Sequence, residues 1–158
     1  MAGNVKTQTK KSKFDKQFKL LEKQVAADMA FEAYGKNTNE LFSNAALATM
    51  EIMVDTAAVE PKMKKIIKLQ GRELKSLLIG FLNEIIYYKD AEQIFLSKFD
   101  IKIKQKDDSV YILTAEIAGE PLNYKKHQMR ADVRAASGQQ SELKQEGKKW
   151  TAKVVLNI

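Results

Sequence analysis

The segment from Arg72 to Ile103 constrains the fold more than any other part of the chain. In its first half, apolar residues recur at steps of three and one, which places them on one wide face of an α-helix. Its second half changes to a period of two, as in a half-buried β-strand. The helix face contains Leu74, Leu77, Leu78, Phe81, Leu82, Ile85 and Ile86, and the strand face contains Phe95, Phe99, Ile101 and Ile103. Since such a helix must be covered, the segment predicts the centre of a two-layer domain.

Shorter periodic segments surround this centre. A helix is predicted from Asn37 or Thr38, either of which can cap it, to about Val54. Strands are predicted within 14–22, 29–34, 65–69, 111–117, 130–136, 142–145 and 150–158, and turns at 107–109, 137–139 and 147–148, with a loop over 119–127. The sum is an α+β fold in which a mostly antiparallel sheet of about seven strands is covered by two long helices.

The positive charge is concentrated at the N-terminus. The chain has a net charge of +7, and residues 1–19 hold six lysines against one aspartate. We interpret residues 1–13 as a disordered basic tail and residues 14–158 as a single domain. The tail is either a solvated leader, the interpretation we favour, or a source of salt-dependent attraction to RNA.

Composition also narrows the cellular setting and the chemistry. There is no cysteine, and no apolar run approaches the roughly 20 residues needed to span a bilayer. We therefore expect a cytoplasmic protein that does not insert into a membrane. Neither GxxxxGK nor GxGxxG occurs, and no elbow motif surrounds any serine, so the sequence gives little support for an enzyme.

Two sets of residues are candidates for a functional site. His127 is the single histidine, and within a polar loop it could be a general base, an RNA contact or a hydrogen-bonded anchor, of which we favour the anchor. Asp28 begins a predicted strand, while Asn157 and the terminal carboxylate of Ile158 end another. If those strands are neighbours, their oxygens could bind calcium or magnesium, although one carboxylate and a neutral amide make a weak set. The alternative, which spacing alone favours, is that Asp28 caps a turn and Asn157 is a surface residue of a strand.

Exposed strand faces and loops offer a second route to RNA. The basic residues expected there are Lys98, Lys102, Lys104, Lys125, Lys126, Arg130, Arg134, Lys148 and Lys153. Lysines in such positions could contact an RNA backbone. Few aromatic residues are outside the core register, so base stacking has weak support.

Several blocks, in order, resemble the archease family over roughly Phe18 to Ile158. They are Ala27-Asp28-Met29, Ala33-Tyr34-Gly35, the first helix from Glu40, the central block from Leu74 to Phe99, Gly119-Glu120-Pro121-Leu122 with Lys126-His127, and the closing strand from Trp150 to Ile158. The resemblance implies an accessory protein of the tRNA-splicing RNA ligase, which promotes guanylylation and multiple turnover of that ligase. It also implies a metal held at the positions of Asp28, Asn157 and Ile158.

The sequence departs from the family pattern at the metal end. Lys23-Gln24-Val25-Ala26 stands where the signature has His-Thr, Asn157 replaces the closing aspartate, and Ala136-Ser137-Gly138 replaces Thr-Tyr-His. The leading hypothesis is therefore a diverged archease that still serves a ligase. The alternatives are a paralogue acting as an RNA-binding or chaperone-like module, and a metal-dependent hydrolase using Asp28 and His127.

Overall fold

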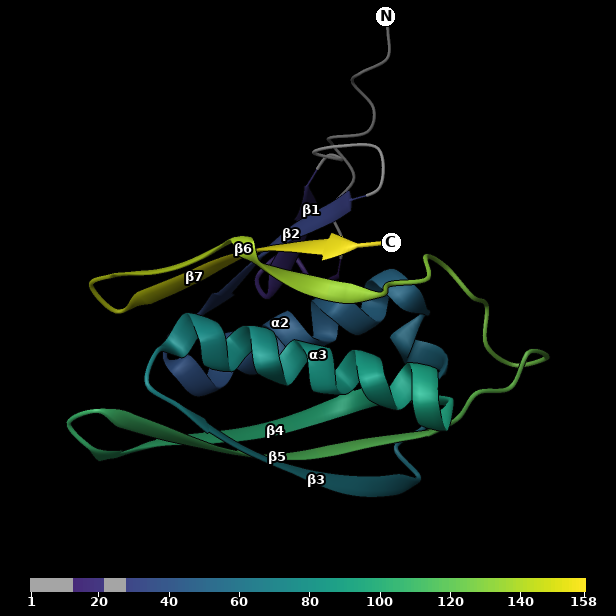
Figure 1. Ribbon diagram of the computed structural model, residues 1–158. Coiled ribbons are helices and arrows are strands. Elements are labelled where there is room, and N and C mark those ends of the chain that lie inside the picture. The colour runs from purple at the N-terminus through teal and green to yellow at the C-terminus, as the bar shows by residue number, and fades with distance from the viewer. Residues whose placement is uncertain (1–12, 22–27) are drawn as a thin grey trace, which may run out of the picture.

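The computed structural model describes residues 13–21 and 28–158 (Figure 1). The described elements are β1 (Phe18–Leu21), β2 (Asp28–Gly35), α2 (Thr38–Met53), a 3-10 turn η1 (Thr56–Ala58), β3 (Met63–Gly71), α3 (Leu74–Glu92), β4 (Ile94–Asp107), β5 (Val110–Pro121), β6 (Ala135–Glu146) and β7 (Lys149–Asn157). The predicted disordered tail, apart from Lys13, lies outside the described residues.

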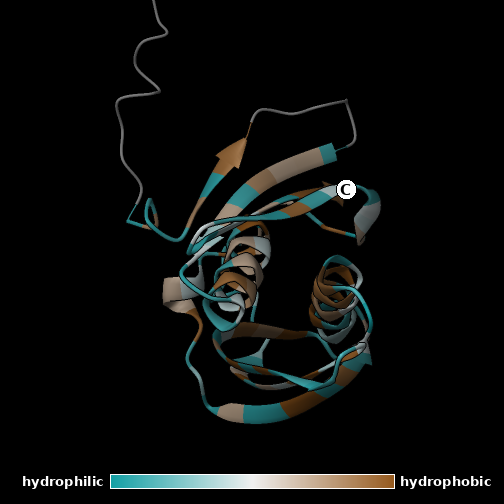
Figure 2. Ribbon diagram, turned by 90° about the vertical axis from the view of Figure 1, so that its left-hand side faces the viewer, coloured by the Kyte–Doolittle hydropathy of each residue, from teal (hydrophilic) through white to brown (hydrophobic). Residues whose placement is uncertain are grey.

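The described strands form two antiparallel sheets. One has the order β1-β2-β7-β6 and the other the order β3-β5-β4. The predicted α+β class, with antiparallel strands and two long helices, is confirmed. The predicted two-layer arrangement is wrong, because Figure 2 shows both helices lying between the two sheets. Helix α2 contacts β2 and β4, and α3 contacts β6 and β3, so each helix packs against both sheets.

Helix α2 suits this middle layer because buried residues lie on more than one of its faces. A helix that covers one sheet needs an apolar stripe of three to four residues in every seven. In α2, by contrast, ten of the sixteen residues are buried: Leu41, Phe42, Asn44, Ala45, Ala46, Ala48, Thr49, Met50, Ile52 and Met53. The alanines among them have small side chains, which let neighbouring elements approach closely. One connected core therefore runs from Phe18 in β1 to Leu156 in β7.

Helix α2 begins and ends at identifiable hydrogen bonds. Of the two predicted caps, Asn37 is the one used, with its Oδ1 accepting from the Glu40 amide at 2.8 Å. At the other end, the amides of Arg130 and Ala131 donate to the carbonyls of Met53 and Ile52 at 2.9 and 3.1 Å. These bonds satisfy carbonyls that a helix end leaves unpaired.

Two predictions between residues 130 and 139 are wrong for related reasons. Of the strand predicted over 130–136, only Ala135 and Ala136 lie in a strand, at the start of β6. Residues 130–134 alternate in burial but form no strand, because amides among them donate to the end of α2 and to the carbonyl of Asn157 instead. Ser137-Gly138-Gln139 is not a turn but part of β6, where the register with β7 is interrupted between Ser137 and Glu142. Ser141 holds this bulge together, since its Oγ donates to the Ser137 carbonyl at 2.5 Å and accepts from the Val155 amide at 3.0 Å.

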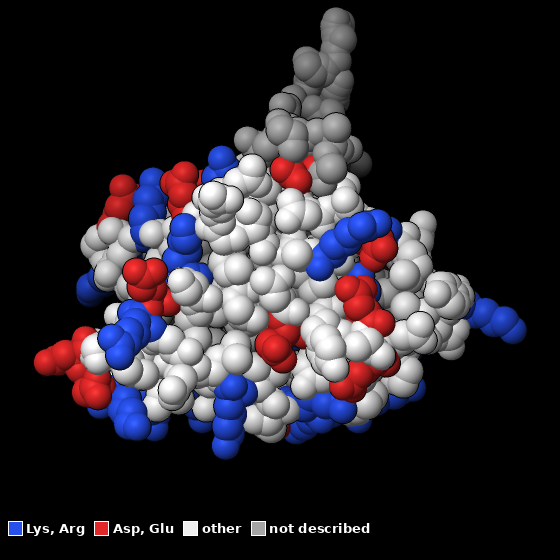
Figure 3. All heavy atoms as spheres, in the orientation of Figure 1, with Lys and Arg blue, Asp and Glu red and all other residues white. Residues whose placement is uncertain are grey.

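The structure separates the basic residues that the sequence grouped together. Lys98, Lys102 and Lys104 are exposed on β4, on the side of the three-stranded sheet that faces away from the helices. In Figure 3, Lys and Arg side chains project along the lower margin, where this sheet lies. The connection between β5 and β6 contains Lys125, Lys126, Arg130 and Arg134, whereas Lys148 lies in the turn between β6 and β7 and Lys153 lies in β7.

Candidate functional site

Asp28 and Asn157 meet at one end of the four-stranded sheet, which is the arrangement that the sequence allowed only if their strands were neighbours. Strands β2 and β7 pair so that these two residues are opposite each other. Asn157 Nδ2 donates to Asp28 Oδ1 at 2.9 Å, and Asp28 is only 6% exposed. Ile158 follows β7 and is half-buried. The antiparallel register therefore brings together Asp28 and Asn157, two of the three candidate metal residues.

The described residues at this end do not by themselves fit a calcium or magnesium site. Such cations take six or more oxygen ligands, among which carboxylates supply most of the charge. Here Asp28 is the single carboxylate of the pair, and one of its oxygens already accepts from an amide. Among the residues that the structure describes, no group of three or more His, Cys, Asp or Glu could hold a metal. The segment before Asp28, including Glu22 and the Lys23–Ala26 departure, lies outside the described residues.

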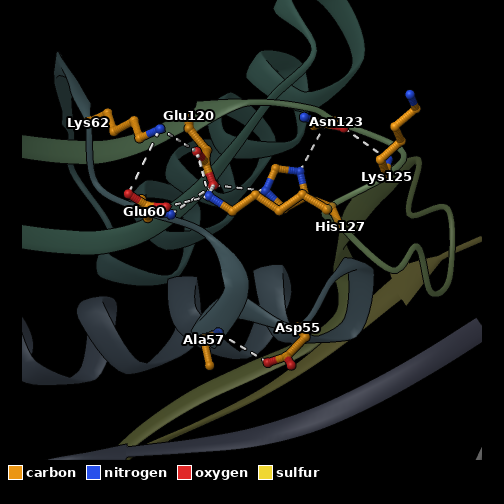
Figure 4. Close-up of polar contacts among 9 residues, drawn as sticks. Asp55, Ala57, Glu60, Lys62, Glu120, Asn123, Lys125 and His127 are labelled. Atoms are coloured by element: carbon orange, nitrogen blue, oxygen red, sulfur yellow. Dashed lines mark hydrogen bonds and ion pairs between the residues drawn. The ribbon is translucent and has the colours of Figure 1, made fainter.

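His127 lies elsewhere, in the connection after β5, and both of its ring nitrogens have partners (Figure 4). Its Nδ1 accepts from the Asn123 amide at 3.0 Å, so the ring proton is on Nε2, which donates to Glu120 Oε2 at 2.9 Å. The side chain is fully buried, and Phe95 packs against the ring edge-on. These contacts favour the anchor over a general base or an RNA contact, because no ring nitrogen is open to a substrate.

Glu120 is the centre of the network that holds His127. It is buried at the end of β5, and its carboxylate accepts from the Glu60 amide at 2.9 Å and from Lys126 Nζ at 2.9 Å. Burial alone would raise the pKa of Glu120, but the hydrogen bonds from Lys126, the Glu60 amide and His127 outweigh it and hold this pKa at about 2. Lys126 also donates to Glu60 at 2.6 Å, which lowers the pKa of Glu60.

A pocket of about 600 Å³ lies beside this network, lined among others by Lys62, Glu120 and Tyr124. Two of its three lysines are paired, because Lys62 lies 3.6 Å from Glu120 and Lys126 bridges Glu60 and Glu120, whereas Lys125 forms no ion pair with any described residue. The arrangement ties the loop after β5 to the segment before β3.

Comparison with known proteins places the chain in a family. The model of the Archease protein family matches residues 18–158. The chain belongs to the Archease family. The protein archease of Methanothermobacter thermautotrophicus is 37% identical over 134 residues, which cover 85% of this chain and 94% of that protein. The protein archease of Sulfurisphaera tokodaii is 34% identical, over 84% of this chain and 93% of its own length.

Solved archease structures have the same fold. The solution structure of protein 1598 from Methanobacterium thermoautotrophicum is similar with a TM-score of 0.78 and 34% identity, over 90% of this chain and 99% of that one. A Thermotoga maritima archease, described as a possible chaperone, is similar with a TM-score of 0.56 and 16% identity, over 87% and 98% of the two chains. Among the described residues of this archease, no helix has the length and apolar character needed to cross a membrane.

One structural residue of this archease escaped the sequence reasoning. Lys89 is 7% exposed in α3, and its Nζ contacts Asp90 at 2.5 Å, Asp132 at 2.6 Å and the Val133 carbonyl at 3.0 Å. Burial would lower the pKa of Lys89, but the hydrogen bonds to both aspartates raise it. The available signal was its position three residues after the buried Ile86, which places Lys89 on the same face of the helix. Lys89 ties the segment before β6 to α3, so its role is structural.

Proposed function

We propose that this archease is an accessory factor of a tRNA-splicing RNA ligase, and that it promotes guanylylation and multiple turnover of that ligase without being an enzyme itself. The observation that carries the proposal is the family match over residues 18–158, which includes the end of the sheet where Asp28 and Asn157 meet. In the described part of the chain, the single histidine has both ring nitrogens occupied, which fits a partner protein better than a hydrolase.

The test measures the ligase rather than the archease. The partner ligase is incubated with GTP, and its guanylylated fraction and its number of turnovers on RNA with a 3′-phosphate end are followed at increasing ratios of archease. We expect both quantities to rise with the ratio. If neither changes at any ratio, the proposal is wrong.

A chaperone-like role, which the description of the Thermotoga maritima relative suggests, gives a different result in the same assay. A chaperone would keep more of the ligase soluble on heating but would leave the rate of guanylylation per soluble ligase unchanged. Light scattering recorded beside the guanylylation assay therefore separates the two roles.

The metal that the family resemblance implies is part of this proposal, although the described residues supply an incomplete ligand set. Asp28 and Asn157, with Ile158 beside them, are the residues that would face such a cation. We expect calcium or magnesium to bind this archease more weakly than it would bind a variant with a second carboxylate at position 157.

A further inference from the structure

The outward side of the three-stranded sheet forms a regular surface, which we call the outer lysine face. Its residues alternate with buried ones along β3, β5 and β4, and the pairing of the strands arranges them in four rows. The rows are Lys64–Ala118–Lys98, Ile66–Glu116–Asp100, Lys68–Thr114–Lys102 and Gln70–Ile112–Lys104. Two adjacent rows at one end of the face therefore hold Lys68, Lys102 and Lys104 without any acid.

This face carries more excess positive charge than the rest of the body. It has five lysines against two carboxylates, a formal charge of +3. Residues 20–158 as a whole contain 21 Lys and Arg against 19 Asp and Glu, a formal charge of only +2. The other residues of the body are thus close to neutral in sum. A polyanion approaching the body should therefore be attracted mainly to the outer lysine face.

Most of these lysines have no carboxylate partner. Lys64 lies 3.8 Å from Glu116, but Lys68, Lys98, Lys102 and Lys104 form no ion pair within 4.0 Å with any residue in the described ranges. Elsewhere, Lys62, Lys89 and Lys126 are each shared between two acids. The ammonium groups of the face are therefore available to an external anion.

The spacing and the residue types favour a nucleic-acid backbone as that anion. Lys102 and Lys104 lie about 7 Å apart along β4, and Lys68 lies about 10 Å from Lys102 across the sheet. A protein partner would typically be anchored by aromatic or arginine side chains, and lysine is depleted in protein interfaces. The face contains neither an aromatic residue nor an arginine. A flat array of single charges without stacking groups suits phosphates and does not read bases.

We propose that the outer lysine face binds the phosphate backbone of RNA, mainly through Lys68, Lys102 and Lys104, without sequence preference. This contact goes beyond ligase activation and does not depend on it. It also differs from attraction by the N-terminal tail, because it lies on the folded body.

The test compares two triple variants of the full chain that lose the same charge. One carries Lys68→Gln, Lys102→Gln and Lys104→Gln. The control carries Lys125→Gln, Lys144→Gln and Lys148→Gln, three exposed lysines outside the face. Fluorescence polarisation measures binding of a labelled single-stranded RNA of twenty nucleotides between 50 and 200 mM salt, and circular dichroism checks that both variants are folded.

We expect the face variant to bind at least about tenfold more weakly at 50 mM salt, and its slope of log affinity against log salt to be shallower by about 2, since each lost phosphate contact removes about 0.7. The control should keep its affinity within about threefold. Equal weakening in both variants would mean that overall charge and the tail account for binding, and unchanged binding in both would mean that the face is not involved; either result overturns the proposal.

The ligase assay separates this inference from the proposed function. A face variant that binds RNA normally but no longer stimulates the ligase would show that an acidic protein surface docks there, which overturns the RNA contact and supports ligase activation. Selective loss of RNA affinity in the face variant, with a ligase that the unmodified archease never stimulates, would support the face and reject the proposed function.

Discussion

Glu120 stays charged although it is buried, and that makes it sensitive to acid. Its pKa of about 2 in the folded chain lies below its ordinary 4.5, so the unfolded chain takes up a proton first as the pH falls. The stability that Glu120 contributes is therefore fully present above about pH 4.5 and is lost as the pH falls toward 2.

Substitution of Glu120 tests this account. Glu120→Gln should lower the free energy of unfolding at pH 7 by about 1.5–3 kcal/mol, because hydrogen bonds to a charged group are lost. The difference from the unmodified protein should shrink between pH 5 and pH 3. Urea unfolding at pH 7, 5 and 3 measures it, with Glu60→Gln as the control, since Glu60 is 58% exposed and an exposed ion pair is worth less. A difference that is the same at every pH would contradict this role for Glu120.

Asn157 now donates a hydrogen bond where the family resemblance implies a second carboxylate. In Asn157→Asp without added metal, two carboxylates would face each other, and their repulsion would raise the pKa of the pair. We expect this variant to be less stable at pH 7 by about 1–3 kcal/mol and to regain stability as the pH falls, because the folded state then binds protons more tightly.

Calcium should also restore the stability of Asn157→Asp, by neutralising the pair. Calorimetric titration of both proteins with calcium and with magnesium measures the affinity directly. Equal affinity in the two proteins would mean that position 157 does not contact the cation, and that other oxygens decide binding.

Gly119 and Gly80 differ in whether the structure has room for a side chain at their positions. Gly119 in β5 pairs with Leu96 in β4, next to the β-bulge of β4. A Cβ at Gly119 would be 1.8 Å from the Phe95 carbonyl oxygen. Gly80 is in the middle of α3, exposed, with no neighbouring atom within 4 Å of a Cβ. The first glycine is needed for close approach of two strands, whereas the second only weakens a helix.

Alanine at each position should therefore have opposite effects. Gly119→Ala should lower the free energy of unfolding by about 3 kcal/mol or more, because backbone atoms must move apart. Gly80→Ala should raise it by about 0.5–1 kcal/mol. Thermal unfolding followed by circular dichroism measures both. A stable Gly119→Ala variant would show that the β4 bulge adjusts easily.

Elements were predictable where their signals were local. The helix beginning at Asn37 and the strand from Ile94 follow from a cap and from alternation within a few residues. Ser137-Gly138-Gln139 has the composition of a turn, but Ser141 and β7 hold it as a bulge. That outcome depends on a strand more than ten residues away, which local composition does not contain.

At the scale of the whole molecule, the arrangement of the strands depends on pairing between distant segments, which local sequence patterns do not specify. The meeting of Asp28 and Asn157 could be raised as a possibility because each lies at the end of a recognisable strand, but the pairing of those two strands could not be read from the sequence. The division of the strands into two sheets was not predictable, because amphipathic strands give the same alternation whichever sheet they join. The sequence signal for two sheets was in α2, whose buried residues exceed the single stripe needed to cover one sheet. Lys89 was missed because a charged side chain is not expected at a buried position.

The central helical layer has a consequence for assembly. Because both helices are enclosed between the sheets, the four-stranded and three-stranded sheets turn their outer faces in opposite directions (Figure 1). A partner bound to the outer face of one sheet would not block the outer face of the other sheet. The fold thus has two outer sheet faces on opposite sides of the helical layer, and a macromolecule bound to one of them would leave the other accessible.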